Sequence, residues 1–471
     1  MSKKFIKQII RNIYMLLSLA VAFGSAIWLW YWNVGVGWDK GYFGVRTLAT
    51  VGVLYSIVYF SFSKMYKAHK IGAYHLVELS FSQMLSYGIS DVVLFVSAFF
   101  WFHNLQRIQT RLFILAFIIQ NVIITFITFF MNRLHARFDE PHRVAIVYGD
   151  ESYPLLLDKM KAFPYRYRIM GCIDQYSDKG EMYKILNRCQ DIYLYEVDTE
   201  LREELLLFCE YRHIDLHFSI NIQDINVRGC EVSTFFDTPF LRNRRTDVVW
   251  YYPIVKRLSD IILSLIALII ASPFMIITAI AIKVEDGGSI FYLQKRLTKD
   301  KKSFYIYKFR SMRENSEKSA MLAKAGDKRV TKVGRIIRRF RIDETPQLFN
   351  ILKGDMTIVG PRPERPEIAK EYEEVLPEFA MRLKVKAGLT GYAQVYGKYN
   401  TTPEDKLKLD LIYISQRSVL MDLKIIFYTV KILFLPESTE GVSADQDTAM
   451  AVNYIDNEDV GKTGRDGRYQ Q

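Results

Sequence analysis

Residues 335–363 read RIIRRFRIDETPQLFNILKGDMTIVGPRP, and this stretch sets the organisation of the second half of the chain. Apolar side chains recur at helical spacing ahead of an adjacent carboxylate pair, Asp343-Glu344, with basic side chains between them. Thr345-Pro346 is typical of a helix cap followed by the first helical residue, and Gly354 of a helix end. We therefore predict that the pair (the dyad) lies just outside a helix N-terminus, where partial positive charge keeps carboxylates ionised and attracts phosphate.

The second half of the chain offers few kinds of reactive side chain. All seven histidines precede residue 218 and all four cysteines precede residue 231, so chemistry there depends on carboxylates, lysine, tyrosine, hydroxyls or a metal. An ionised Asp343 can be a nucleophile without a separate base, and Glu344 can hold a hard cation such as Mg²⁺. Arg362, fixed between two prolines, supplies a donor fork that matches phosphate. The combination suits phosphoryl transfer, although an Asp-Glu pair taken alone is more often a helix cap.

Six short motifs follow one another between residues 250 and 435. They are Tyr307–Met312, the dyad Asp343-Glu344, Gln347–Asn350, Lys353–Met356, Val359–Pro363 and Gly388–Val395. With these motifs the chain resembles the bacterial sugar transferases, which are monotopic polyprenyl-phosphate phosphoglycosyl transferases. The region before residue 250 resembles the long form of that family, with N-terminal membrane helices and a nucleotide-fold-like domain.

The resemblance implies a reaction in two steps. Asp343 would attack the sugar-linked phosphate of a nucleotide sugar, giving a covalent phosphosugar-enzyme and a nucleoside monophosphate, and polyprenyl phosphate would then take the phosphosugar. Glu344 would be a Mg²⁺ ligand and Arg362 a phosphate contact. Secondary candidates for phosphate binding are Arg338, Lys308 and Arg310.

Three departures from the family pattern concern sugar and nucleotide contacts rather than the dyad. Lys386-Ala387-Gly388 stands where the family usually has Arg-Pro-Gly. Tyr392 replaces a common Trp, and Leu297-Thr298 replaces the Pro-Gly that usually follows Gln294-Lys295-Arg296.

Length and charge bound the function further. A chain of 471 residues is long enough for two or three domains, and its formal net charge of +12 suits anionic partners. The resemblance implies that these partners are membrane phospholipid, undecaprenyl phosphate and a nucleotide sugar, most simply a UDP-hexose. Nucleic acid also fits the charge, but the chain has no nucleic-acid motif and its apolar segments point to a membrane, so we expect no nucleic-acid partner.

Four apolar runs, at residues 13–32, 47–63, 84–102 and 112–131, open the chain. Each approaches the ~20 residues that a helix needs to cross a bilayer, so residues 1–135 are predicted to form a four-helix transmembrane bundle. Lysines and arginines flank the runs so that both the chain start and everything after residue 131 should be cytosolic, although Arg107 and Arg111 argue against this. Asp91, inside the third run, could be functional or could partner another helix. The expected location is the bacterial inner (cytoplasmic) membrane, in a multi-pass protein whose catalytic domain faces the cytosol.

Residues 140–250 alternate between strand-like and helix-like segments. They predict a degenerate Rossmann-like α/β domain, because the first strand is followed by Gly149 but not by a glycine-rich fingerprint. One glycine is too few for the backbone to approach a pyrophosphate. We expect a structural, regulatory or dimerising role for this domain, which leaves a homodimer open.

Residues 251–435 are predicted to form a mainly α, monotopic catalytic domain. Residues 258–282 are nearly all apolar, bracketed by Lys256-Arg257 and Lys283 and interrupted by Ser272-Pro273, so we expect residues 256–283 to form a re-entrant membrane helix rather than a kinked span. Residues 406–434 and 330–340 are amphipathic; whether they lie at the membrane interface or inside the protein stays open. Residues 436–471 are polar and predict a disordered tail.

These observations favour an undecaprenyl-phosphate sugar-1-phosphate transferase that begins the assembly of an exopolysaccharide, capsule or O-antigen. Three alternatives from other classes are a non-catalytic membrane scaffold or regulator of polysaccharide assembly, a membrane-bound nucleotide-sugar dehydratase or epimerase, and a polytopic sugar-phosphate transferase, which would need many more apolar runs than the sequence has. The intact dyad argues against the first, and the missing glycine-rich fingerprint argues against the second.

Overall fold

The computed structural model describes residues 3–35, 44–72, 74, 76–102, 109–138, 140–151, 153–164, 166–228, 231–235, 238–242, 249–313, 329–397 and 401–433. The chain divides into two compact units, residues 1–219 and residues 220–471. The tail predicted for residues 436–471 lies outside the described residues. Within those residues, five helices are long and apolar enough to cross a membrane, four in the first unit and one in the second.

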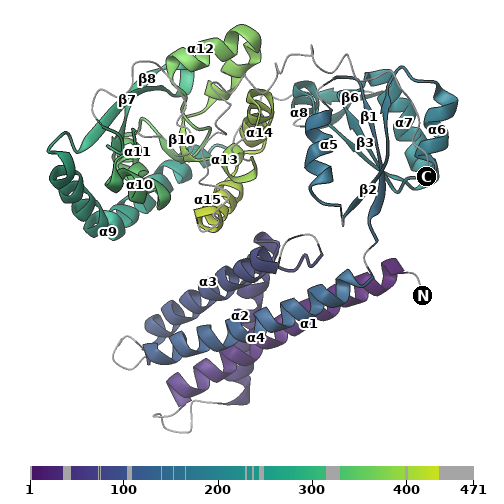
Figure 1. The fold of residues 1–471 in the computed structure, drawn as a ribbon. Helices are drawn as coiled ribbons and strands as arrows, with labels where there is room; N and C mark the ends of the chain where they lie inside the picture. The colour runs from purple at the N-terminus through teal and green to yellow at the C-terminus, as the bar shows by residue number, and fades with distance from the viewer. Residues whose placement is uncertain are drawn as a thin grey trace. The chain divides into compact units, whose positions relative to one another are not determined.

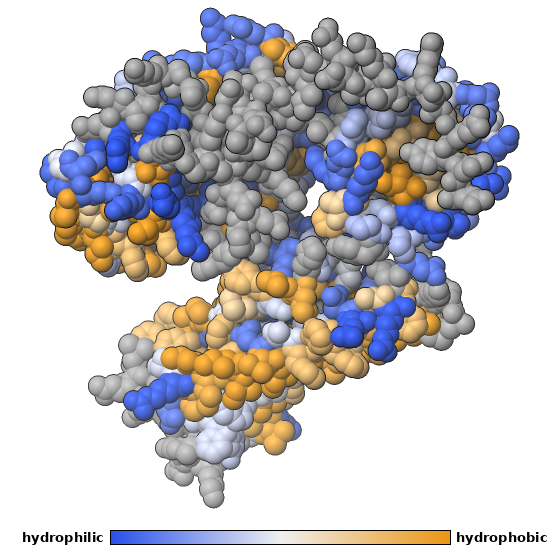
Figure 2. Space-filling model, in the orientation of Figure 1, coloured by the Kyte–Doolittle hydropathy of each residue, from blue (hydrophilic) through white to orange (hydrophobic). Residues whose placement is uncertain are grey.

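The first unit begins with four long helices that pack on one another (Figure 1). They are α1 (Lys3–Trp30), which continues into a π-helical turn (Tyr31–Gly35), α2 (Val45–Met65), α3 (Leu76–Phe102) and α4 (Thr110–Ala136). Their shared core includes Tyr14, Tyr59 and Tyr87, all fully buried. Apolar side chains also cover the outside of these helices (Figure 2), as expected for surfaces that face lipid. The prediction of apolar helices in residues 1–135 is confirmed.

Asp91 of α3 lies in the buried polar interior of these helices. Its carboxylate accepts a hydrogen bond from Tyr55 of α2 at 2.7 Å and another from Gln120 of α4. The side chain therefore joins three helices, which fits the helix-partnering alternative.

A four-stranded parallel sheet follows in the same unit. Its elements are β1 (His142–Tyr148), α5 (Pro154–Lys161), β2 (Tyr167–Asp174), α6 (Lys179–Leu186), β3 (Asp191–Tyr195), α7 (Thr199–Arg212) and β4 (Asp215–Phe218). The strand order is β2-β1-β3-β4, and Val144 in β1 pairs with Ile169 on one side and Asp191 on the other. The order reverses between β1 and β3, which is where doubly wound sheets bind ligands beyond the strand ends.

The loops beyond these strand ends bind one another. Gly149 donates its N–H to Tyr195 O at 3.0 Å, and Gln175 donates its N–H to Tyr148 O at 2.9 Å. The side chain of Gln175 also accepts from Asp198 N at 3.0 Å. A Cβ added at Gly149 would lie 2.3 Å from Glu196 O, so the glycine serves close packing between these loops.

The second unit is mainly helical and carries small two-stranded sheets. Its elements are α8 (Ile222–Arg228), β5 (Glu231–Phe235), β6 (Thr238–Arg242), α9 (Tyr252–Asp286), β7 (Phe291–Leu297), β8 (Ser303–Phe309), α10 (Lys332–Arg339), α11 (Gln347–Lys353), β9 (Thr357–Val359), α12 (Pro366–Val375), β10 (Gly388–Thr390), α13 (Tyr392–Tyr396), α14 (Pro403–Gln416) and α15 (Val419–Leu433). Strands β7 and β8 are antiparallel, and β9 and β10 are parallel, with Thr357 opposite Gly388. The amphipathic segment at residues 406–434 is thus two helices, and their apolar faces enter a protein core with Leu407, Leu411 and Ile425.

Helix α9 is continuous over 35 residues, with Pro273 inside it, and changes direction along its length (Figure 1). Proline has no N–H to give to Ile269 O, four residues earlier, and Ser272 Oγ donates to that carbonyl instead at 2.8 Å. Apolar side chains of its middle turns are exposed and form an orange patch in Figure 2. Both ends bind the same unit: Tyr252 donates to Asp422 at 3.0 Å, and Asp286 forms an ion pair with Arg310.

Candidate active site

The dyad lies in a 3-10 turn, Ile342–Glu344, directly before α11. Gly354 ends α11 in a left-handed conformation (φ 97°), as predicted. The prediction that Thr345 caps the helix is wrong: its hydroxyl donates backwards to Ile342 O at 2.7 Å, and the helix begins at Gln347. The backbone N–H of Thr345 donates to the same carbonyl at 3.1 Å and closes the 3-10 turn, so the dyad stands just before the helix.

Three cations surround the carboxylate of Glu344. Arg362 Nη2 donates to Oε1 at 2.8 Å, Lys308 Nζ lies 3.4 Å from the same oxygen, and Arg341 Nη1 lies 4.0 Å from Oε2. Burial opposes ionisation of Glu344, but Arg362, then Lys308 and Arg341, outweigh it and hold its pKa well below the usual range. Glu344 is therefore a carboxylate at neutral pH, and it gathers cations beside Asp343.

Asp343 has the opposite electrostatic character. Burial, and next the negative charge of Glu344, raise the pKa of Asp343 to about 6, against the effect of Lys308, Arg338 and Arg362. An aspartate with this pKa is still mainly ionised at pH 7 but is more basic than an exposed one. Such a carboxylate is a better nucleophile at the pH where it works.

The predicted phosphate contacts occupy different places. Arg362 and Lys308 lie beside the dyad, and Arg338 is near enough to lower the pKa of Asp343. Arg310, at the end of β8, is buried and forms an ion pair with Asp286 at the end of α9. This pair gives Arg310 a contact that holds α9 to the sheet, and its phosphate role stays a prediction.

Helix α9 holds the two elements that carry the site. Arg257 donates to Ile351 O and Leu352 O, at 2.7 Å each, at the C-terminus of α11, the helix that follows the dyad. One turn further on, Asp260 accepts from Thr357 Oγ1 at 2.7 Å and Ile358 N at 3.0 Å, in the strand that leads to Arg362. These contacts join residues about a hundred positions apart, so no local sequence pattern predicts them.

Asn350 connects α11 to the strand that carries Lys308. Its Nδ2 donates to Tyr305 O at 2.8 Å, and its Oδ1 accepts from Tyr307 N at 3.0 Å. The side chain is fully buried, so both bonds are shielded from water. Asn350, the last residue of the motif Gln347–Asn350, thus fixes the strand of Lys308 relative to the dyad. Its place in a motif was the one sequence signal that could have pointed to this role.

A magnesium ion would have to share its ligands with a substrate. Among the described residues no group of three or more His, Cys, Asp or Glu side chains is placed to hold a metal. Mg²⁺ is commonly bound by one or two carboxylates together with substrate phosphates, and the dyad supplies two. Oε1 of Glu344 faces both Arg362 and Lys308, whereas Arg341 stays 4.0 Å from Oε2. Oε2 would therefore be the less occupied of the two oxygens, and the residues present would fit a metal ion whose remaining ligands come from a substrate phosphate.

Residues 251–436 match the sequence model of a family described as bacterial sugar transferase. The chain is 43% identical over 184 residues to a UDP-N-acetylgalactosamine-undecaprenyl-phosphate N-acetylgalactosaminephosphotransferase from Aeromonas hydrophila, covering 38% of this chain and 44% of that protein. It is 37% identical over 187 residues to the exopolysaccharide production protein PSS of Rhizobium leguminosarum bv. phaseoli, covering 38% of this chain and 94% of that protein. It is 29% identical over 395 residues to the galactosyl transferase CpsE of Streptococcus agalactiae, covering 75% of this chain and 86% of that protein.

These matches differ in how much of each relative they include. The chain spans less than half the length of the Aeromonas protein but nearly all of the Rhizobium protein. The part shared with the Rhizobium protein has about the length of the region that matches the family model, which contains the dyad, Lys308 and Arg362.

Proposed function

The chain belongs to the bacterial sugar transferase family, and from this premise we propose that it moves a hexose-1-phosphate from a UDP-sugar to undecaprenyl phosphate. The observation that carries the proposal is the pairing of Asp343, whose pKa is raised to about 6 chiefly by burial, with a carboxylate, Glu344, that has Lys308 and Arg362 beside it. Relatives named as undecaprenyl-phosphate sugar phosphotransferases support the same reaction class.

In the first step, a carboxylate oxygen of Asp343 attacks the phosphorus bonded to the sugar. The bond from that phosphorus to the bridging oxygen of the diphosphate breaks, and nucleoside monophosphate leaves with the electron pair. The product is an acyl phosphate that joins Asp343 to the sugar phosphate. Lys308 and Arg362 bring positive charge to the phosphoryl oxygens, where charge neutralisation and positioning supply most of the catalysis.

In the second step, a phosphate oxygen of undecaprenyl phosphate attacks the same phosphorus. The bond to Asp343 breaks, the carboxylate is regenerated, and the sugar phosphate is now joined to the lipid through a diphosphate. No separate base is needed, because both nucleophiles are already anions. Glu344, through Oε2, would hold Mg²⁺ together with the diphosphate of the donor, and when bound the ion would neutralise charge on the leaving nucleotide.

A membrane-bound lipid phosphate requires a site at headgroup depth. We propose that α9 enters the inner leaflet and returns, so that the catalytic unit stays on the cytosolic face of the bacterial inner membrane, where nucleotide sugars are found. Three observations support this: the helix contains Pro273 and changes direction along its length, its middle turns are apolar and exposed, and both of its ends bind the same unit. A spanning α9 would separate those ends by the thickness of the bilayer.

The proposal is tested by half-reactions on the full-length protein in membranes. Wild type, incubated with a panel of radiolabelled UDP-sugars, should release nucleoside monophosphate and yield labelled protein, and undecaprenyl phosphate should discharge that label. Asp343→Asn should abolish both events. Glu404→Gln, on an exposed part of α14, is the matched carboxylate control and should behave as wild type. Normal turnover in Asp343→Asn, or no transfer from any UDP-sugar, would contradict the proposal.

A further inference from the structure

The loop that presents Arg362 is held by its carbonyl groups. Its sequence, Gly360-Pro-Arg-Pro-Glu364, contains two prolines and therefore few N–H groups. Each carbonyl from Pro361 to Glu364 accepts a hydrogen bond: from Gly388 N at 2.9 Å, Arg382 Nη2 at 3.1 Å, Arg296 Nη1 at 3.0 Å and Leu297 N at 3.0 Å, in that order. The backbone at Arg362 and Pro363 is thus held by two arginine side chains from distant parts of the chain.

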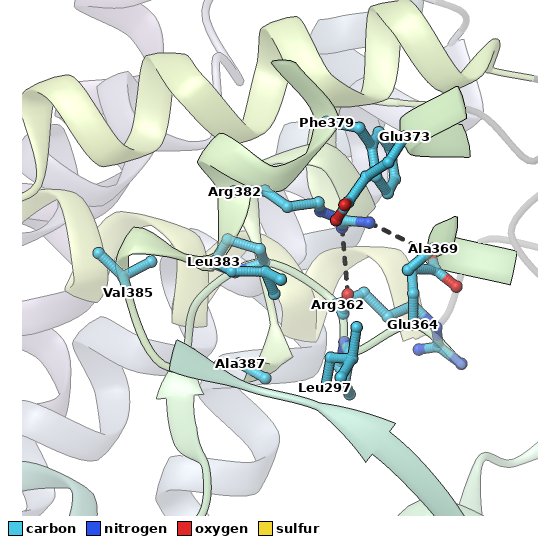
Figure 3. Close-up of a pocket in the computed structure, with 12 residues that line it drawn as sticks. Leu297, Arg362, Glu364, Ala369, Glu373, Phe379, Arg382, Leu383, Val385 and Ala387 are labelled. Atoms are coloured by element: carbon cyan, nitrogen blue, oxygen red, sulfur yellow. Dashed lines mark hydrogen bonds and ion pairs between the residues drawn. The ribbon is translucent and has the colours of Figure 1, made fainter. Parts of the chain in front are cut away.

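We propose that Arg382 and Arg296 are positioning residues, which fix the backbone of the loop so that the guanidinium of Arg362 meets Glu344 and the substrate phosphate. The inference rests on the proposed function and adds residues that do not touch the substrate. Arg382 is only 2% exposed, and its fork points from the 3-10 turn Pro377–Lys384 to the Arg362 carbonyl, beside the pocket drawn in Figure 3.

Both arginines are oriented by further contacts. Gln294 Oε1 accepts from Nε and Nη2 of Arg296, at 3.1 and 2.5 Å, which leaves Nη1 to face Pro363 O. Arg382 is held by Asp410 at 2.7 Å, and its guanidinium lies 4.8 Å from the ring centre of Phe379. The motif Gln294-Lys295-Arg296 therefore has a role at the Arg362 loop.

The carboxylates around the two arginines offset their charge. Glu364 lies 2.6 Å from Lys406, 3.4 Å from Arg382 and 3.8 Å from Arg296. Burial opposes ionisation of Glu364, but Lys406 and then Arg382 hold its pKa at about 2, so it stays charged. With Asp410 also present, Arg382 and Arg296 act as fixed donors to the backbone rather than as free cations that would draw phosphate away from Arg362.

A buried ion network could instead serve stability alone, and a double-mutant cycle separates the two roles. Arg382→Lys and Arg296→Lys keep the charge beside Glu364 and lose the planar fork that reaches two acceptors at once. Each is made in wild type and in Arg362→Ala, and kcat/KM for nucleoside monophosphate release is measured. If the arginines act through Arg362, each change should lower kcat/KM by roughly 10- to 100-fold in wild type, the scale of a small misplacement of a reacting group. In Arg362→Ala the same changes should lower it by less than about twofold.

The matched control is Lys301→Met, which removes an ion pair to Glu373 at the rim of the same pocket and leaves the loop carbonyls bound; it should behave as wild type. Three results would each overturn the inference: equal losses of kcat/KM in both backgrounds, an unchanged kcat/KM in the lysine variants, or a wild-type kcat/KM in Arg362→Ala. None of them would contradict the transferase activity. If Arg382→Lys cannot be extracted as a folded protein, the same cycle with Arg296→Lys decides between the two roles, because Arg296 is less buried. Failure of wild type to release nucleoside monophosphate would instead overturn the proposed function and, with it, the inference.

Discussion

The backbone N–H of Ala387 donates to the hydroxyl oxygen of Thr298 over 3.1 Å, and both residues are buried. These residues stand where the family usually has proline and glycine. Proline would have no N–H to donate, and glycine would have no side-chain oxygen to accept. Two departures from the family pattern therefore meet in one hydrogen bond, and Thr298 Oγ1 donates onward to Asp355 O at 3.0 Å.

Thr298→Gly should destabilise the second unit, because it leaves the Ala387 N–H buried without an acceptor. The expected cost is about 1–3 kcal/mol, the usual penalty for an orphaned buried donor. Thr298→Gly with Ala387→Pro restores the family pattern and should cost less than Thr298→Gly alone. Thermal unfolding of the detergent-extracted protein measures both, with Thr298→Ser as the control that keeps the hydroxyl. A double variant no more stable than Thr298→Gly would show that the two positions are independent.

Features encoded by neighbouring residues were predictable from the sequence, whereas contacts between residues far apart along the chain were not. Gly354 and the four apolar helices were predictable, because a left-handed helix end and a lipid-facing helix are encoded by adjacent residues. The contact of Arg257 with Ile351 O spans 94 positions, and the one of Arg296 with Pro363 O spans 67. Such side-chain-to-carbonyl bonds carry no local pattern, since any residue type can supply the carbonyl.

The site itself was partly predictable for the same reason. The dyad and Arg362 belong to short motifs whose residue types limit their chemistry, and the structure brings them together with Lys308. Arg382 lies in a stretch of mixed charge that gives no signal of burial, and Thr345 has a helix-capping sequence but makes a backward bond. The burial of Arg382 depends on tertiary contacts with distant residues, whereas the bond of Thr345 reaches a carbonyl three positions earlier and is a local alternative to capping.

Re-entry of α9 predicts that the turn between β7 and β8 faces the cytosol. Lys302 is exposed in that turn, so we expect Lys302→Cys, in a background without the four natural cysteines, to resist a membrane-impermeant maleimide applied to intact cells. It should react once the cells are permeabilised. Lys40→Cys is the positive control, because Lys40 lies between the first two apolar runs and a cytosolic chain start would place that loop outside. Equal labelling of both cysteines in intact cells would place the catalytic unit outside the membrane.

Removal of divalent cations should stop the first half-reaction, because Glu344 and Asp343 together carry negative charge where a donor diphosphate must approach. We expect excess EDTA to abolish nucleoside monophosphate release and added Mg²⁺ to restore it. Glu344→Gln should raise the Mg²⁺ concentration needed for half-maximal rate by about tenfold or more, in line with other losses at metal sites. The control is Glu404→Gln, which should titrate as wild type. Full activity in excess EDTA would remove Glu344 from a metal-binding role.

The pH dependence of the first half-reaction should be bell-shaped. The reactive form of Asp343 is its carboxylate, and its pKa is raised to about 6, so kcat/KM should fall tenfold per pH unit below about 6 and level off above it. Burial lowers the pKa of Lys308 from its ordinary value, although Glu344 opposes this, so its positive charge and part of the rate should be lost on the alkaline side.

Lys308 variants separate the two limbs of this profile. Lys308 lowers the pKa of Asp343, so Lys308→Met should move the acid limb to higher pH and remove the alkaline limb, at a reduced maximum rate. Lys308→Arg keeps the cation in a group that stays protonated, so the acid limb should remain near pH 6 while the alkaline limb disappears. Both expected pH profiles have the same structural reason: the ammonium of Lys308 lies 3.4 Å from Glu344 and is near enough to lower the pKa of Asp343. An acid limb that stays fixed in Lys308→Met would show that the group titrating near pH 6 is not Asp343.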